Sequence, residues 1–169
     1  MARSIVNRVA NSPLVTIDLE DYYNDIPRVQ IDMAEWLEEG LILREQSFRE
    51  ALKQKDWSVF QNSYVAIFCS SEAIVPAWAS MLVASYLAPF VLKMSFGSIA
   101  TLDTAIFQDI VQSIDYSVYR DKPIIIKGCS NKPIPQTAFI HLIANLKPVA
   151  KSVMYGEACS SVPLFKKNK

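Results

Sequence analysis

The segment that decides the fold reads Asp115-Tyr-Ser-Val-Tyr-Arg-Asp-Lys-Pro-Ile-Ile-Ile-Lys-Gly-Cys-Ser130. It predicts a short turn, a buried strand of three isoleucines and a cysteine just past the end of that strand. A related segment comes earlier and reads Asp56-Trp-Ser-Val-Phe-Gln-Asn-Ser-Tyr-Val-Ala-Ile-Phe-Cys-Ser70. This pair indicates an internal duplication, which can be followed from Leu41 onward at an offset of 59 residues.

Most matches between the two copies fall on residues that begin or end helices and strands. Pro76 corresponds to Pro135, and each suits the first turn of a helix, where the N–H that proline lacks would be unpaired anyway. Convergence of two similar βαβ units would produce a comparable pattern, because such units have stereotyped requirements. We assign residues 1–40 to N-terminal strands and a short helix, 41–97 and 98–156 to the two repeats, and 157–169 to a cysteine-containing C-terminal tail.

Four apolar segments, at 64–68, 91–96, 123–127 and 150–155, lack the alternation of a half-buried strand. Such runs are typical of strands that helices cover on both faces. Strands that alternate with helices favour right-handed crossovers and a largely parallel sheet. We therefore predict an α/β fold: a single domain whose mostly parallel sheet is built from two duplicated βαβ-containing halves, with N-terminal strands added.

Two stretches near the N-terminus alternate between apolar and polar residues. Val15, Ile17 and Leu19 share one face of the first, and residues 29–33 follow the same pattern, so we expect two half-buried strands. The polar segment 22–27 is suited to join them as a hairpin. An acidic cluster, Asp18 with Glu20 and Asp21, has the residue types of a cation site, although a solvated strand edge is the commoner meaning of such a cluster.

Charge and cysteine content exclude several classes of protein. Seventeen basic residues balance seventeen acidic ones, and the basic stripe of a nucleic-acid-binding protein is missing, so we expect no nucleic-acid partner. Three cysteines do not form a disulfide framework, and no signal peptide is recognisable, so we expect reduced thiols and a cytoplasmic protein.

Residues 73–92 form a run of twenty uncharged residues, which is long enough to span a bilayer. Pro76 and Pro89 leave only about three turns of helix between them, because proline begins or ends helices. We therefore expect a buried helix followed by a buried strand, and no membrane partner.

Six segments of the chain stand out together: Ile5-Val-Asn-Arg-Val-Ala10, Leu14-Val-Thr-Ile-Asp-Leu-Glu-Asp21, Gly40-Leu-Ile-Leu-Arg44, Ile74-Val-Pro-Ala-Trp78, Lys127-Gly-Cys-Ser130 and Gly156-Glu-Ala-Cys-Ser160. With these motifs the chain resembles one bacterial family of uncharacterised proteins, classified as a domain of unknown function. The resemblance covers nearly the whole chain. It implies no activity, because none is established for the family, but genes of the family tend to lie near genes for iron–sulfur cluster assembly, an association that favours thiol or iron chemistry and assembly proteins as partners.

The three cysteines are the main candidates for chemistry. Cys69, Cys129 and Cys159 each follow the carboxyl end of a predicted strand, the edge at which parallel sheets bind ligands. We predict a shared metal site of these thiolates with Glu157 as the harder ligand, suited to zinc or an iron–sulfur cluster. Glu72 and His141 are alternative donors. The serine after each cysteine would hydrogen-bond the sulfurs or a bound cofactor; these are Ser70, Ser130 and Ser160.

Two other interpretations of the cysteines stay open. Cys129, which follows a glycine, is a candidate reactive thiol or sulfur carrier. Alternatively, all three are small buried hydrophobic residues at strand ends, and the chain is a non-catalytic protein-interaction module. No acid–base pair stands out, so whether the chain is an enzyme is left open. A symmetric homodimer is expected only because most soluble oligomers are symmetric dimers.

Overall fold

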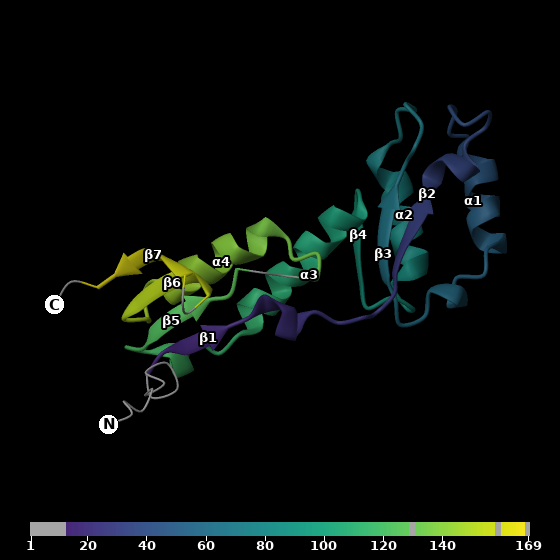
Figure 1. Ribbon diagram of the computed structural model, residues 1–169. Coiled ribbons are helices and arrows are strands. Elements are labelled where there is room, and N and C mark those ends of the chain that lie inside the picture. The colour runs from purple at the N-terminus through teal and green to yellow at the C-terminus, as the bar shows by residue number, and fades with distance from the viewer. Residues whose placement is uncertain (1–12, 129–130, 158–159, 168–169) are drawn as a thin grey trace, which may run out of the picture. The chain divides into compact units, whose positions relative to one another are not determined.

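The computed structural model describes residues 13–128, 131–157 and 160–167 (Figure 1). The chain is a mixed α/β protein with mostly parallel strands, as the sequence predicts. The strands form two sheets, however, and not the single sheet that we expected. The chain divides into two compact units, each with its own sheet: unit 1 comprises Met1–Tyr23 and Phe107–Lys169, and unit 2 comprises Asn24–Ile106.

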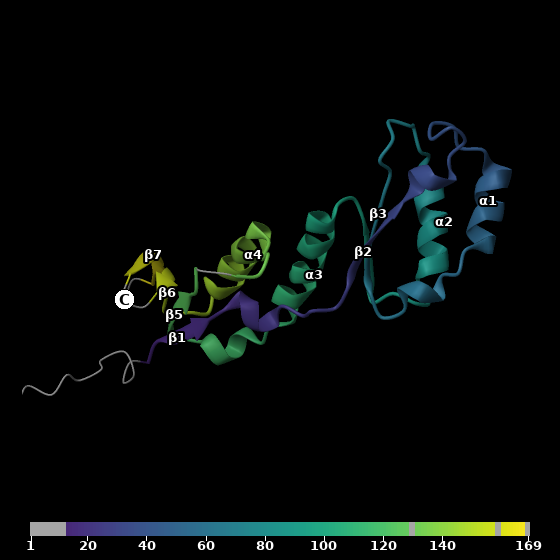
Figure 2. The same ribbon diagram turned by 45° about the vertical axis from the view of Figure 1, so that its right-hand side comes forward.

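Unit 2 contains a three-stranded parallel sheet in the order β2-β3-β4. Val65 and Ile67 of β3 face a core to which both α1 and α2 contribute, and Figures 1 and 2 draw these two helices beside the sheet. The first half of α3 contacts the opposite face, where Asp103 pairs with Arg28. The elements are β2 (Arg28–Asp32), the 3₁₀ helix η2 (Met33–Trp36), α1 (Glu45–Gln54), η3 (Ser58–Phe60), β3 (Tyr64–Phe68), α2 (Ala77–Leu87), β4 (Lys93–Phe96) and α3 (Ile99–Ser113).

Unit 1 contains a four-stranded sheet in the order β1-β5-β6-β7, in which only β7 is antiparallel to its neighbour. Its core combines Ile124 and Ile126 of β5 with apolar residues of α4 and of the second half of α3. The elements are β1 (Val15–Ile17), η1 (Leu19–Tyr22), the end of α3, η4 (Tyr116–Tyr119), β5 (Pro123–Ile126), α4 (Gln136–Leu146), β6 (Ser152–Glu157) and β7 (Ser160–Lys166).

Equivalent contacts recur in the two units at the predicted offset of 59 residues. Trp57 donates its indole N–H to the carbonyl of Leu52 at 2.8 Å, and the Tyr116 hydroxyl donates to the carbonyl of Val111 at 2.7 Å. Helices α2 and α4 begin directly after Pro76 and Pro135, as predicted. The two units therefore share an order of elements and a set of turns, while descent from a duplication stays a prediction.

The N-terminal strands do not form the predicted hairpin. β1 pairs with β5 and β2 pairs with β3, both in parallel, so the two strands extend different sheets. The alternating sequence was correctly assigned to strands, but alternation shows only that one face is buried. It says nothing about which strand is the neighbour.

Two further predictions need correction. Helix α2 is not fully buried, because Met81 is 69% exposed, and β4 lies at the edge of its sheet with Phe96 60% exposed. The segment assigned to a C-terminal tail contains β7, which pairs with β6 through a register shift between Val153 and Met154. Pro163 lies within β7, and an edge strand tolerates proline because one side of its backbone has no strand to bond.

Candidate functional site

The described residues include four of the seven predicted site residues. Cys69 and Ser70 lie in unit 2, directly after β3, whereas Glu157 and Ser160 lie in unit 1, at the ends of β6 and β7. The remaining three predicted residues, Cys129, Ser130 and Cys159, lie outside the described residues. The predicted meeting of three thiols therefore stays a prediction.

Cys69 lies in a loop that is fixed by hydrogen bonds. Its thiol is 3.3 Å from the hydroxyl of Ser71, and its side chain packs against the core of unit 2. Ser70 donates its backbone N–H to Asp32 at 2.9 Å. Burial disfavours the charge of Asp32, but hydrogen bonds from Ser70 and from the N–H of Ala34 outweigh burial and lower the pKa of this carboxyl. In unit 2 the serine thus anchors the loop to the end of β2.

The corresponding edge of unit 1 is fixed by an ion pair. Lys127, which follows β5, donates from Nζ to Oδ2 of Asp18, which follows β1, at 2.6 Å. Burial opposes the charge of Asp18, yet the hydrogen bonds from Lys127 and from the N–H of Glu20 prevail and lower the pKa of Asp18. The hydrogen bond to Asp18 and its negative charge raise the pKa of Lys127. Both groups are charged at neutral pH.

Described residues hold the chain on both sides of Cys129. The Tyr155 hydroxyl donates to the carbonyl of Gly128 at 3.1 Å, and a Cβ on residue 128 would lie only 2.9 Å from the Tyr155 ring. On the other side, Glu20 accepts hydrogen bonds from the backbone N–H groups of Asn131 and Lys132. The acidic cluster predicted from the sequence is used here for structure: Asp18 pairs with a lysine and Glu20 anchors a loop.

Glu157 and Ser160 face each other across the β6–β7 pair. The two residues between them in sequence, 158 and 159, connect the two strands and lie outside the described residues. Glu157 also lies close enough to Lys127 for its negative charge to contribute to the raised pKa of that lysine. The predicted donor Glu157 is therefore near the ends of both β5 and β6.

A pocket of about 350 Å³ opens beside this edge of unit 1. It is lined by Ile134, Gln136, Phe139 and Tyr155, and the two aromatic rings meet edge to face at a centroid distance of 6.1 Å. Gln136 is the first residue of α4. The lining of the pocket combines apolar and aromatic side chains with one amide.

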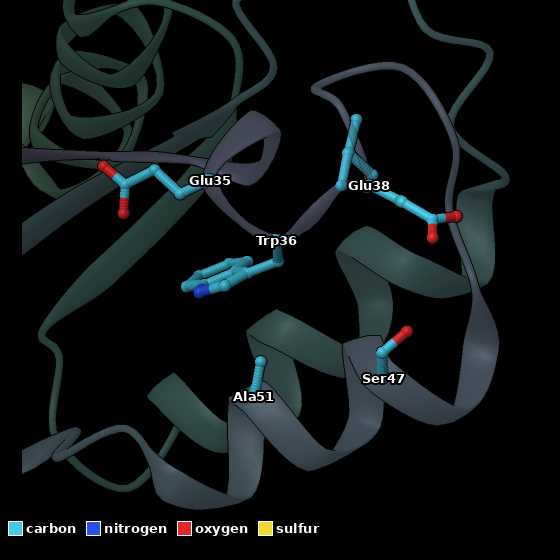
Figure 3. Close-up of a pocket in the computed structure, with 6 residues that line it drawn as sticks. Glu35, Trp36, Glu38, Ser47 and Ala51 are labelled. Carbon is cyan, nitrogen blue, oxygen red and sulfur yellow. The ribbon is translucent and has the colours of Figure 1, made fainter.

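A second pocket, of about 340 Å³, lies in unit 2 between η2 and α1 (Figure 3). The Trp36 ring lies above Ala51 of α1, and the carboxylates of Glu35 and Glu38 point away from each other. Glu38 is paired with Arg44. Because its carboxylates do not converge, this pocket is a poor candidate for a metal site.

Other potential metal donors are dispersed. Glu72 is exposed in the loop before α2, and His141 lies half-buried within α4. Within the described ranges, no three His, Cys, Asp or Glu side chains form a group that could hold a metal ion. The same ranges contain no helix with the length and hydropathy to cross a membrane.

Sequence reasoning missed the contribution of Lys127, Asp18 and Tyr155 to this edge. One signal was available: Val15-Thr-Ile-Asp18 and Val29-Gln-Ile-Asp32 share a pattern, and both aspartates accept the N–H two residues on at 2.9 Å. The pattern marks equivalent strand ends in the two units.

A family model described as Protein of unknown function (DUF2480) matches residues 3–167, so both units fall within the match. Neither a curated protein nor a solved structure matches the chain.

Proposed function

We propose that the chain, which belongs to the DUF2480 family of proteins of unknown function, carries a thiol site at the carboxyl edge of the unit 1 sheet. Cys129 and Cys159 would supply the thiolates, and Glu157 the harder ligand. One observation carries this proposal. The neighbouring strands β5 and β6 run in parallel and in register, with Ile126 beside Tyr155, and each is followed closely by a cysteine.

The spacing of neighbouring strands is compatible with the short distance between thiolates that such a site needs. The observed register ends with Ile126 beside Tyr155. If it continued for two more residues, Gly128 would lie beside Glu157, at the spacing of about 4.8 Å between neighbouring strands. Cys129 comes one residue after Gly128, and Cys159 two residues after Glu157. Two thiolates bound to one zinc ion, with bonds of about 2.3 Å, lie within roughly 4 Å of each other.

The fixed surroundings of the loop add to this argument. Tyr155 holds Gly128 from one side of Cys129, and Glu20 holds Asn131 and Lys132 from the other. A metal site gains affinity when its ligands are held in place before the metal binds. Two thiolates and a carboxylate would suit zinc, with the fourth position left to water or another donor. An iron–sulfur cluster with one non-cysteine ligand would need a third thiolate. Ser130 and Ser160 would hydrogen-bond the sulfurs.

In this proposal the protein works in the cytoplasm, where thiols stay reduced, and its partners are iron–sulfur assembly proteins. A metal-free variant of the proposal uses Cys129 as a sulfur carrier or nucleophile. Lys127 favours a thiolate nearby through its positive charge, although its pairing with Asp18 reduces that effect.

The test is metal and acid-labile sulfide analysis of the full chain purified without oxygen. The wild type is compared with the double variant Cys129→Ala/Cys159→Ala and with Cys69→Ala as the matched control. We expect near-stoichiometric zinc or iron in the wild type and in Cys69→Ala, and loss of metal in the double variant. Equal loss in Cys69→Ala would instead support the three-thiol site that the sequence predicts.

Metal-free wild type would contradict metal coordination. The alternative function, a non-catalytic interaction module with structural cysteines, predicts this result together with uniformly slow labelling of all three thiols by an alkylating reagent. Selective, fast labelling of Cys129 in metal-free protein would instead favour the reactive-thiol variant.

A further inference from the structure

Basic residues gather at the amino edge of the unit 1 sheet, at the other end of the strands from the proposed thiol site. Lys151 donates its N–H to the carbonyl of Lys122 at 2.9 Å, and Lys167 donates its N–H to the carbonyl of Lys151 at 3.0 Å. The three lysines precede β5, precede β6 and follow β7, so they form a row across three neighbouring strand ends. We name as the basic edge six exposed residues: Arg120, Lys122, Lys147, Lys151, Lys166 and Lys167.

Backbone contacts hold the other basic residues near this row. Asp121 donates its N–H to the carbonyl of Val149 at 3.0 Å, which joins the turn after η4 to the turn after α4. Arg120 and Lys147 are the C-terminal caps of these two helices. Residues that are scattered through the second half of the sequence therefore form one surface, although no basic stripe is visible in the sequence.

Few carboxylates balance this charge. Within the described part of the chain, the only ion pair of the basic edge joins Lys167 to Asp121 at 3.8 Å, and the side chain of Asp121 is 75% exposed. Asp115, at the start of η4, accepts hydrogen bonds from the N–H and the hydroxyl of Ser117. Six basic residues and these two acidic residues give this edge a net charge of +4.

The turns themselves do not require this charge, because unit 2 builds the same turns without it. At the offset of 59 residues, the counterparts of residues 120, 122, 147 and 151 are all uncharged: Gln61, Ser63, Ala88 and Leu92. The equivalent backbone bonds are present, since Leu92 donates to Ser63 and Asn62 donates to Phe90, both at 2.9 Å. Like charges on neighbouring strand ends repel each other. A concentration of one charge that the fold does not need is typical of a surface that attracts a partner of the opposite charge.

We propose that the basic edge binds a short acidic segment of another protein. Neighbouring strands lie about 4.8 Å apart, so the row of three lysines spans about 10 Å. This is the length of about three residues of an extended chain. Carboxylates spaced along such a segment can each meet one lysine of the row. The inference does not depend on the thiol site.

Other polyanions fit this edge less well. A nucleic acid is typically held along many phosphates, and a single strand is also held by stacking on aromatic rings. The rings nearest to the basic edge, Tyr116 and Tyr119, pack against the core of unit 1 instead. Val118, the exposed apolar side chain of η4, is a small anchor for a membrane.

The test is fluorescence anisotropy of a labelled oligoglutamate peptide, titrated with the full chain at several salt concentrations. The variants Lys122→Ser and Lys151→Leu introduce the residues that unit 2 has in the same turns. The matched control is Lys53→Gln, because Lys53 is also an exposed lysine but lies on α1 of unit 2. We expect the wild type and Lys53→Gln to bind the peptide equally, and each variant of the basic edge to bind it about threefold more weakly. Binding should weaken as the salt concentration rises, and circular dichroism checks that every variant is folded.

A wild type that does not bind the peptide at low salt would overturn the proposal. So would equal weakening in Lys53→Gln, because binding would then follow the total charge of the chain. Oligothymidylate and vesicles of phosphatidylcholine with phosphatidylserine are titrated in parallel. If either binds more tightly than the peptide and loses affinity in Lys122→Ser, the occupant is a nucleic acid or a membrane and the proposal is wrong.

Discussion

Lys127 and Asp18 connect the carboxyl ends of β5 and β1 through a hydrogen bond of 2.6 Å between Nζ and Oδ2. The lysine also donates its backbone N–H to the carbonyl of Ile17 at 2.9 Å. One residue therefore closes the strand pair through its backbone and fixes the aspartate through its side chain. In unit 2, Phe68 occupies the position that corresponds to Lys127. There Asp32 accepts a hydrogen bond from the backbone N–H of Ser70 instead.

This pair predicts a pH dependence of stability. The pKa of Asp18 is lowered from 3.8, so its carboxylate stabilises the folded state above that pH, and the stabilisation is lost as the pH falls through the lowered pKa. The pKa of Lys127 is raised from 10.5, so its contribution is complete below that pH and is lost as the pH rises through the raised pKa.

We expect Asp18→Asn to lower the free energy of unfolding at neutral pH by about 1 kcal/mol. The asparagine can still accept the N–H of Glu20, so the loss reports mainly the charge. Urea denaturation over a pH series measures this loss, and the difference from wild type should shrink as the pH falls through the lowered pKa of Asp18. In the Asp18→Asn background, Lys127→Met should lower the free energy of unfolding by little more. If the effects of the two substitutions were fully additive, the two residues would not interact.

Gly128 lies beside the proposed thiol site, and a side chain added there should cause a steric clash. In Gly128→Ala the new Cβ would lie 2.9 Å from Cζ of Tyr155, so the ring must move and its hydrogen bond to the residue 128 carbonyl must lengthen. We expect a loss of about 1 kcal/mol in the free energy of unfolding, measured by urea denaturation.

The double variant Gly128→Ala/Tyr155→Ala tests this cause. If the clash with the Tyr155 ring causes the loss, Gly128→Ala should lower the free energy of unfolding only slightly in the Tyr155→Ala background. Gly40→Ala is a useful contrast: nothing lies within 4 Å of its added Cβ, but its φ of +70° is unfavourable for alanine, so no second substitution should rescue it. Equal costs of Gly128→Ala with and without the Tyr155 ring would contradict the steric explanation.

Replacing Glu20 should loosen the segment that follows Cys129. Its carboxylate accepts two backbone N–H groups, from Asn131 and Lys132, and Glu20→Ala removes both bonds. We expect the Lys132 amide to exchange with solvent faster and Cys129 to react faster with an alkylating reagent. The labelling rate of Cys69, in the other unit, is the internal control. Unchanged exchange at Lys132 would show that Glu20 does not hold the loop.

Much of the architecture could be predicted because it depends on local features. The apolar run at 64–68 is β3, and Pro76 and Pro135 lie directly before α2 and α4, because proline suits helix starts and breaks helix interiors. The offset of 59 residues correctly related positions such as Asn62 and Asp121, which share a positive φ, at 58° and 56°.

Strand partnership and burial could not be predicted, because they depend on tertiary packing. The alternation of β1 and β2 is the same whether they pair with each other or with separate sheets. The uncharged sequence of α2 indicated burial, yet Met81 of this helix is 69% exposed. For the site, the sequence identified the strand ends but not the Lys127–Asp18 pair, since the two residues are distant in sequence.

The last prediction concerns the buried ion pair of unit 2. Arg28 Nε donates to Asp103 Oδ1 at 2.8 Å, with side-chain exposures of only 11% and 7%, and Arg28 also donates to the carbonyls of Asn24 and Ile26. The pair joins β2 to the first half of α3. We expect Asp103→Asn to lower the free energy of unfolding by about 3 kcal/mol, because it leaves a buried guanidinium without its counter-charge.

Replacing both partners should cost less than removing one, since Arg28→Met/Asp103→Leu leaves no charge behind. Urea denaturation of the single and double variants measures both effects. The exposed pair of Arg49 with Glu45 on α1 is the control, and Glu45→Gln should change the free energy of unfolding by only about 0.3 kcal/mol. A loss as small as this in Asp103→Asn would mean that water or another group compensates the charge of Arg28.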